Sequence, residues 1–169
     1  MKKKLNLLAF VGIVIVLLGI VVFLIPIGTG VVRSITNPST GVVSKEFYSG
    51  YDVIFGNKSI SGLSSSTAFI AAFTLLIIGV VFQAIAAALC VPNPEGSKKF
   101  SGFLFFVGGL AEIVTGIVYL LATKLAPLPS ASNVSYSLGW SLLVAAVAAL
   151  VGALLSLVFG VIALRRKGK

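Results

Sequence analysis

The chain has 169 residues, of which 58% are hydrophobic and only 10% are charged, and its mean hydropathy is +1.14. An ordinary soluble domain carries about 25% charged residues and a disordered chain has low hydrophobicity, so both classes are excluded. The net charge is +9, histidine is absent and there is one cysteine. These counts exclude an intramolecular disulfide, a Ser-His-Asp triad and any metal or haem site that needs histidine. We therefore expect a chain that lies mostly in lipid, is not an enzyme and needs no cofactor.

Four apolar segments are long enough to cross a membrane as helices. A helix needs about 20 apolar residues to span a hydrocarbon core of about 30 Å. In chain order, the predicted spans are residues 5–27, 68–91, 100–123 and 138–164. Because these runs are continuous rather than alternating, they favour helices over the strands of a β-barrel. The predicted fold is an all-α membrane protein, an antiparallel bundle of four transmembrane helices with a small extracellular loop cap.

The first predicted span follows the lysines at positions 2–4 and so also resembles a secretory signal peptide. A signal peptide has an apolar core of about 7–15 residues, followed by a cleavage site of small residues. Here the apolar run is longer, meets Pro26 and has no such site. We therefore expect this segment to be retained as the first transmembrane helix.

The first outer loop is predicted to run over residues 28–67 and to have an aromatic centre. Residues 42–48 have the composition of a short strand, whereas on a helix Phe47, Tyr51 and Phe55 would share one face. In either case we expect these side chains to fold back on the bundle or to lie at the membrane surface. Two interpretations stay open, a lid over the outer helix ends or a recognition surface. The recognition candidates are Phe47, Tyr51, Asp52 and Phe55.

Two polar residues are predicted to lie deep in the membrane, Gln83 in the second span and Glu112 near the middle of the third. A charged group at this depth costs about 2.5–3.5 kcal/mol on insertion scales, so the acid should stay neutral or face a partner. Because the inner turn over residues 92–99 is short, the two spans form a hairpin, and the two side chains differ in depth by roughly 6 Å. One interpretation is a protonated Glu112 bonded to Gln83 or to a backbone carbonyl. The other is a proton- or cation-binding carboxylate on a transport path.

Small residues at intervals of four line the predicted spans, where they let helix backbones approach closely. They flank Gln83 and Glu112, and they form two ridges in the fourth span, one of which runs from Ser137 to Ala153. The helix-packing candidates are Gly79, Gly108, Gly116, Ala148, Gly152, Ser156 and Gly160. In the first span, Gly12 and Gly19 are weaker indications of the same kind of close packing. The ridges of the fourth span pack inside the monomer, or they form a seam with a second copy or another membrane protein; both interpretations stay open.

The basic residues predict the orientation, because lysine and arginine collect on the cytoplasmic side of a membrane protein. Nine of the thirteen lie before the first span, in the inner turn over residues 92–99 or in the tail over residues 165–169. Four lie in the outer loops over residues 28–67 and 124–137. We therefore expect both termini in the cytoplasm, and we expect lipid head groups rather than nucleic acid to meet the positive charge.

The order of the segments resembles that of tetraspan proteins. A long first and a short second outer loop between inner termini match the plan of claudins, but the first loop lacks the claudin tryptophan and paired cysteines. The tetraspanin Cys-Cys-Gly motif is missing as well. Residues 49–56 and 136–140 resemble segments of small uncharacterised tetraspan membrane proteins of low-GC Gram-positive bacteria and mollicutes. This resemblance implies a location in the plasma membrane and no particular activity.

Two functions are expected from these features. The first is a non-enzymatic structural or accessory tetraspan protein that packs with other membrane proteins or with a second copy of itself. The alternative is a transporter or channel subunit, coupled to protons or cations, with Glu112 at its ion site. A membrane enzyme would need a catalytic set in the first outer loop, where Glu46 and Asp52 are the only acids.

Overall fold

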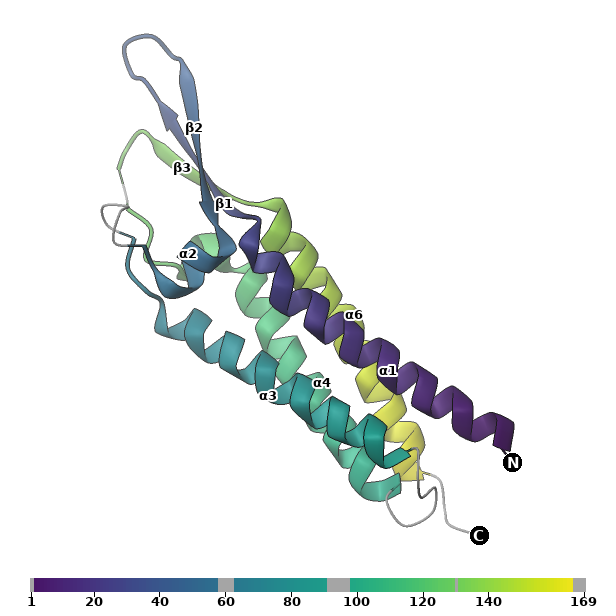
Figure 1. The fold of residues 1–169 in the computed structure, drawn as a ribbon. Coiled ribbons are helices and arrows are strands. Elements are labelled where there is room, and N and C mark those ends of the chain that lie inside the picture. The colour runs from purple at the N-terminus through teal and green to yellow at the C-terminus, as the bar shows by residue number, and fades with distance from the viewer. Residues whose placement is uncertain (1, 58–62, 91–97, 130, 166–169) are drawn as a thin grey trace.

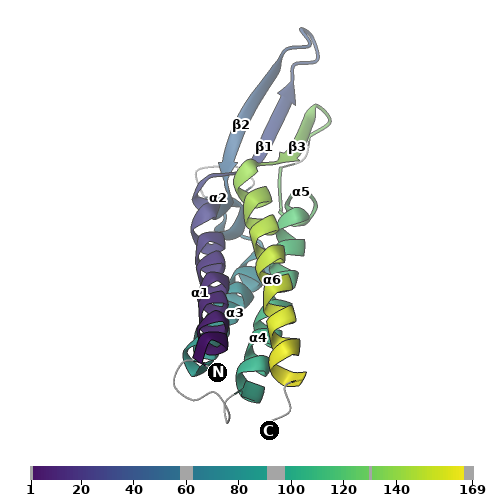
Figure 2. The same cartoon turned by 90° about the vertical axis from the view of Figure 1, so that its right-hand side faces the viewer.

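The computed structural model of the chain describes residues 2–57, 63–90, 98–129 and 131–165. Within these residues, four long helices lie side by side, and a small antiparallel sheet caps one end of them (Figure 1). The long helices are α1 (Lys2–Leu24), α3 (Thr67–Cys90), α4 (Lys98–Leu120) and α6 (Trp140–Arg165). Helices α1 and α4 run toward the sheet, whereas α3 and α6 run away from it (Figure 2). Thus α1 begins and α6 ends at the end of the bundle opposite the sheet.

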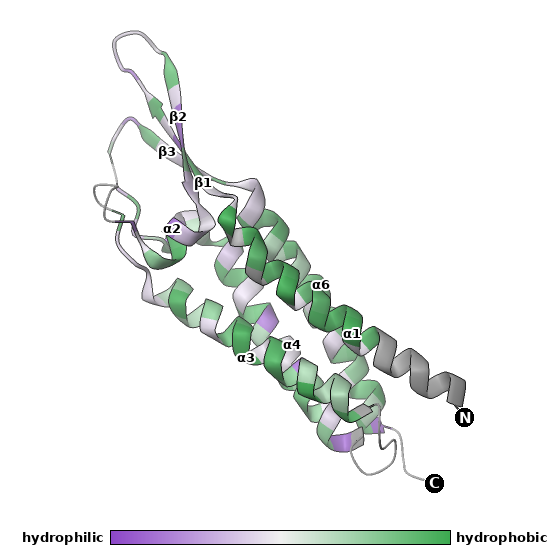
Figure 3. Ribbon diagram, in the orientation of Figure 1, coloured by the Kyte–Doolittle hydropathy of each residue, from purple (hydrophilic) through white to green (hydrophobic). Residues whose placement is uncertain are grey.

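Three of the described helices have the length and composition to cross a membrane, namely Thr67–Leu89, Lys99–Leu120 and Trp140–Arg165. The shortest has 22 residues, or about 33 Å at 1.5 Å per residue. Their outward faces expose large apolar side chains such as Ile78, Leu110 and Leu154, and the bundle is coloured mainly as hydrophobic along its length (Figure 3). So large an apolar surface is compatible with a membrane protein. In α1, the apolar stretch with described side chains is Val11–Val22.

The four helices pack so that α1 and α4 each contact both α3 and α6. Two apolar clusters fill the space between them. The cluster nearer the sheet includes Leu76, Tyr119 and Leu142, and it continues under the cap. The cluster nearer the chain ends includes Ile15 and Phe105. The core is therefore divided along the axis of the bundle.

The cap contains β1 (Thr29–Thr36), β2 (Val43–Ser49) and β3 (Val134–Leu138). The described strands form one sheet in the order β2-β1-β3, with both pairs antiparallel. Strands β1 and β2 are a hairpin of the first outer loop, and its turn contains Gly41 with a φ of +70°, a conformation that favours glycine. Strand β3 comes from the second outer loop and pairs with β1, so that Tyr136 lies opposite Arg33.

Short helical segments connect the sheet to the bundle. A 3-10 turn, η1 (Ile25–Ile27), contains Pro26, follows α1 and leads into β1. Helix α2 (Gly50–Phe55) begins with a capping box in which Ser49 Oγ accepts the Asp52 N–H and the Asp52 carboxylate accepts the Ser49 N–H. It ends at Gly56, which has a φ of +76°. Helix α5 (Ala122–Leu125) follows α4 after a break at Leu121.

The predicted mostly helical fold is confirmed, and in the described part of the chain the predicted loop cap is a small sheet, in which strands from the loop after α1 and the loop before α6 pair. The strand predicted over residues 42–48 is confirmed as β2. The helical alternative is wrong for Phe47, which lies on β2, so only Tyr51 and Phe55 share a helix. Strand β3 was not expected, since five residues are too short to show a period. The turn was predicted over residues 92–99 and the tail over residues 165–169; residues 92–97 and 166–169 lie outside the described residues, and the others lie on α4 and α6.

Candidate functional site

A polar layer lies between the two apolar clusters, near the middle of the bundle. On α4, Glu112 lies between Phe105 of one cluster and Tyr119 of the other. The other long helices place small or polar residues at the corresponding level. The polar layer comprises Gly19 of α1, Gln83 of α3, Glu112 of α4, and Gly152 and Ser156 of α6.

The carboxyl group of Glu112 and the amide of Gln83 meet in this layer. Both side chains are buried, with exposed fractions of 1% and 0%. Neither carboxyl oxygen of Glu112 has a hydrogen-bond partner among the described residues, and the same is true of Gln83 Oε1. The Gln83 amide interacts with the carboxyl group, although no hydrogen bond of normal geometry joins the two side chains. The structure thus brings together the two polar residues that the sequence placed on one helical hairpin.

The amide of Gln83 is also attached to α6. Its Nε2 donates to Ser156 Oγ at 3.2 Å, and Ser156 Oγ donates to the backbone carbonyl of Phe105 at 2.6 Å. All three groups are buried. Buried polar groups bonded in this way hold helices together, because few other partners exist in an apolar medium. The contact of Gln83 with Ser156 was not predicted, since it depends on how α6 is rotated about its axis.

Two hydroxyl side chains of α4 bond to the backbone of α3. Ser101 Oγ donates to the carbonyl of Ala86, and Thr115 Oγ1 donates to the carbonyl of Ala72, both at 2.9 Å. Both hydroxyl residues are fully buried. Sequence reasoning missed them, although a hydroxyl residue inside an apolar run is a signal that could have found them.

Glycines allow α1 and α6 to approach the carboxyl group of Glu112. A Cβ atom at Gly152 would lie 3.1 Å from Glu112 Oε2, and one at Gly19 would lie 3.5 Å from Oε1. A Cβ atom at Gly19 would also collide with the side chain of Val80 on α3. The two glycines therefore line the site, one from α1 and the other from α6. Of the two, the sequence marked Gly152 as a packing residue and Gly19 only as part of a sparser pattern.

Other predicted packing residues lie where α4 meets its neighbours. A Cβ atom at Gly79 of α3 would lie 3.1 Å from the carbonyl oxygen of Gly108 on α4. A Cβ atom at Gly160 of α6 would lie 2.9 Å from the carbonyl oxygen of Gly102, and one at Gly116 would press on Leu150 of α6. At these glycines, neighbouring helices therefore approach so closely that a Cβ atom would meet the facing helix.

Both small-residue ridges of α6 face the inside of the bundle. On the first, Ser141, Ala145, Ala149 and Ala153 are fully buried. On the second, Gly152, Ser156 and Gly160 are buried and Ala148 is half-buried. Ser137 lies on β3 instead, so the first ridge begins at Ser141. Of the two interpretations of the ridges, the structure supports packing inside the monomer.

The outer-loop candidates divide into two exposed and two engaged side chains. Phe47 on β2 and Tyr51 on α2 have exposed fractions of 65% and 58%. The Asp52 carboxylate accepts hydrogen bonds in the capping box and from Asn57 Nδ2 at 2.9 Å. Phe55 is half-buried and packs its ring against α3. Of the four candidates, Phe47 and Tyr51 are therefore the two whose side chains are most open to solvent.

An ion pair joins the two strands of the hairpin. Arg33 Nη1 on β1 donates to Glu46 Oε2 on β2 at 2.9 Å and to Tyr48 Oη at 3.4 Å. The hydrogen bond with Tyr48 is the main cause that raises the pKa of Arg33. On β3, partial burial raises the pKa of Tyr136, whose hydroxyl donates to the carbonyl of Pro129. An ion pair this close to solvent contributes only about 0–1 kcal/mol, so we assign it to the stability of the sheet.

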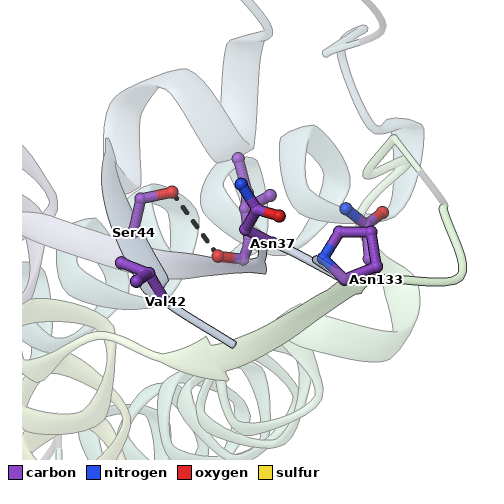
Figure 4. A pocket seen from close by; sticks show the side chains of 6 residues that line it. Asn37, Val42, Ser44 and Asn133 are labelled. Atoms are coloured by element: carbon purple, nitrogen blue, oxygen red, sulfur yellow. Dashed lines mark hydrogen bonds between the residues drawn. The ribbon is translucent and has the colours of Figure 1, made fainter. Parts of the chain in front are cut away.

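A shallow pocket lies at the tip of the hairpin (Figure 4). It has a volume of about 380 Å³ and is lined by Ile35, Asn37, Pro38, Val42, Ser44 and Asn133. Its polar groups are used locally: Asn37 Oδ1 accepts from the turn backbone, and Asn133 Nδ2 donates to the carbonyl of Thr36. None of the lining side chains is ionisable, so this pocket offers no acid–base chemistry.

No protein-family model matches the chain, and no curated protein matches it significantly. The resemblance of residues 49–56 and 136–140 to bacterial tetraspan proteins therefore stays a prediction.

Proposed function

We propose that this protein is a four-span protein of the plasma membrane, with both termini in the cytoplasm, and that it acts without catalysis by packing with other membrane proteins. Helix α1 supports the fourth span, since it has 23 residues and packs against two membrane-capable helices. It also exposes Ile13 and Leu17 on its outward face. The excess of lysine and arginine at the bundle end opposite the sheet supports the orientation.

The observation that carries the proposed role is the exposure of two aromatic side chains on the cap, Phe47 and Tyr51. Exposed aromatic residues are enriched where proteins bind one another. The small-residue ridges of α6 are buried within the bundle, so they are not open to a partner protein. A partner membrane protein would therefore contact the cap or the lipid-facing sides of the helices.

A photoreactive amino acid at position 47 tests this contact in intact membranes. We expect cross-linked adducts with another membrane protein, and we expect the double variant Phe47→Ser, Tyr51→Ser to lose that protein in co-purification. The same probe at position 40, in the exposed turn of the hairpin, is the matched control and should give fewer adducts. Adducts with lipid alone, or equal protein adducts at both positions, contradict the proposed contact.

A second candidate function is transport coupled to protons or cations, with Glu112 as the ion-binding carboxylate. The observation in its favour is a buried carboxyl group with no hydrogen-bond partner among the described residues, because acids inside a membrane commonly mark ion pathways. In proteoliposomes we expect a pH-driven flux that Glu112→Gln removes, since glutamine keeps the size but cannot titrate. Glu46→Gln, on the exposed sheet, should leave the flux unchanged. Absence of flux, or flux that survives Glu112→Gln, contradicts this function.

A further inference from the structure

The polar layer holds more hydrogen-bond acceptors than donors. Oε1 and Oε2 of Glu112 and Oε1 of Gln83 are buried oxygens without a partner in the described structure. The orientation of the Gln83 amide follows from Ser156, whose hydroxyl hydrogen goes to the Phe105 carbonyl. Ser156 Oγ must then accept a hydrogen, and Gln83 Nε2 is the donor that reaches it. Gln83 Oε1 is therefore the end of the amide that needs a donor.

Among the described residues, no positively charged group lies beside the carboxyl group of Glu112. The neighbours of its carboxyl group are Gly19 from α1, Gln83 from α3 and Gly152 from α6, and none of these titrates. On α4 itself, the nearest titratable group within the described residues is the phenol of Tyr119, two turns away. Burying a carboxylate without a counter-charge is strongly unfavourable, and the neutral amide of Gln83, which also donates to Ser156, offsets only part of that cost.

A proton fits these oxygens better than a metal ion does. Ca²⁺ takes about six to eight oxygen ligands and Mg²⁺ about six, whereas the site offers three unpartnered oxygens. No group of three or more acidic, cysteine or histidine side chains that could hold a metal ion occurs in the part of the chain that the structure describes. A proton needs one carboxyl oxygen, and the O–H group that forms is a donor of the kind that Gln83 Oε1 lacks.

We propose that Glu112 is a proton-binding site, and that the bound proton completes a hydrogen-bonded chain from Glu112 through Gln83 and Ser156 to the backbone of Phe105. The chain passes from α4 to α3, then to α6 and back to α4, so that one proton joins three helices. Removal of the proton places a negative charge beside the amide oxygen of Gln83 and weakens these contacts. This proposal rests on the second candidate function only in part: it identifies the bound ion as a proton, but Glu112 can bind a proton whether or not the protein transports one.

Infrared spectroscopy of the full chain in lipid bilayers tests the proton directly. A protonated carboxyl group has a C=O stretching band above the amide bands, and an ionised one does not. At neutral pH we expect one such band in the wild type, absent in Glu112→Gln and retained in Glu46→Gln. Gln83→Leu removes the acceptor, so the band should move to the higher frequency of a carboxyl group without a hydrogen bond.

Each result of this experiment decides one part of the proposal. A wild-type spectrum without the band, or a band that survives Glu112→Gln, overturns the proton-binding site. A band that Gln83→Leu does not move overturns the chain through Gln83. A band that behaves as expected in a protein without flux supports proton binding and refutes transport, so the two failures are distinguishable.

Discussion

Gly19 and Gly152 leave room for the carboxyl group of Glu112, since a Cβ atom at either position would come within about 3.5 Å of one of its oxygens. Glycine costs a helix about 1 kcal/mol relative to alanine. At these two positions that cost is offset by close contact between helices. The size of the side chain at each position therefore controls how well the polar layer packs.

Enlarging Gly152 should destabilise the bundle. We expect Gly152→Leu to lower the stability by about 1–3 kcal/mol, because the larger side chain is forced against the carboxyl group of Glu112. Thermal unfolding in nanodiscs measures the change. Val151→Leu, at a neighbouring position whose side chain points outward, is the matched control and should keep the wild-type midpoint. Equal midpoints for the two variants would contradict this account of the site.

The pairing of Gln83 with Glu112 could be predicted from the sequence, because each residue interrupts an apolar run and the two runs are joined by a short turn. The role of Gly19 and the contact with Ser156 could not be predicted in the same way. Both residues lie on helices that are distant in sequence from Glu112. Their place in the polar layer depends on the rotation of each helix about its axis, which continuous apolar runs do not specify.

At the scale of elements, the cap depends on the pairing of β1 with β3, two strands that are separated in the sequence by α3 and α4. Strand β2 could be predicted from its own composition, and its hairpin with β1 is local. Strand β3 pairs with β1 only because the helices bring the two outer loops together. At this junction, a Cβ atom at Gly139 would collide with the carbonyl oxygen of Thr29. Such long-range pairing does not follow from the period of a five-residue segment.

The capping box of α2 offers a test of the cap. Ser49→Ala removes the side-chain oxygen that accepts the Asp52 N–H, and loss of such a cap costs about 0.5–2 kcal/mol. Because α2 has only six residues, we expect it to open locally and its backbone amides at positions 52–54 to exchange faster with deuterium. Ser64→Ala, at an exposed position, should leave this exchange unchanged. Unaltered protection in Ser49→Ala would show that packing on α3 alone holds the helix.

At the scale of the whole molecule, a cap of mixed hydropathy and an apolar bundle follow one another along a single axis (Figure 3). The spans that became α3, α4 and α6 could be predicted from hydropathy alone, and all three are confirmed as helices able to cross a membrane. The first span stays a proposal, because the described apolar stretch of α1 is Val11–Val22. Local composition thus predicted the helices, whereas the sheet required the assembled molecule.

Cysteine labelling tests the orientation of the axis. In a Cys90→Ser background, Ser39→Cys on the hairpin should react with an impermeant maleimide added outside intact cells. Lys99→Cys, at the start of α4, should react only after the membrane is permeabilised. The 23 residues of α4 extend about 35 Å, enough to separate its two ends by the thickness of a bilayer. Labelling of both positions from outside, or the reverse pattern, would contradict the proposed topology.

The pairing of β1 with β3 links α1 to α6 at the sheet end of the bundle, because β1 follows α1 through η1 and β3 leads into α6. It holds together the ends of these two helices that lie next to the sheet (Figure 1). If α1 tilts relative to α6, the tilt is centred on the paired strands, and the displacement between the two helices increases with distance from the sheet. A tilt of this kind would separate α1 from α6 beside Glu112, so we expect water to reach Glu112 first from the end of the bundle where α1 begins and α6 ends (Figure 1).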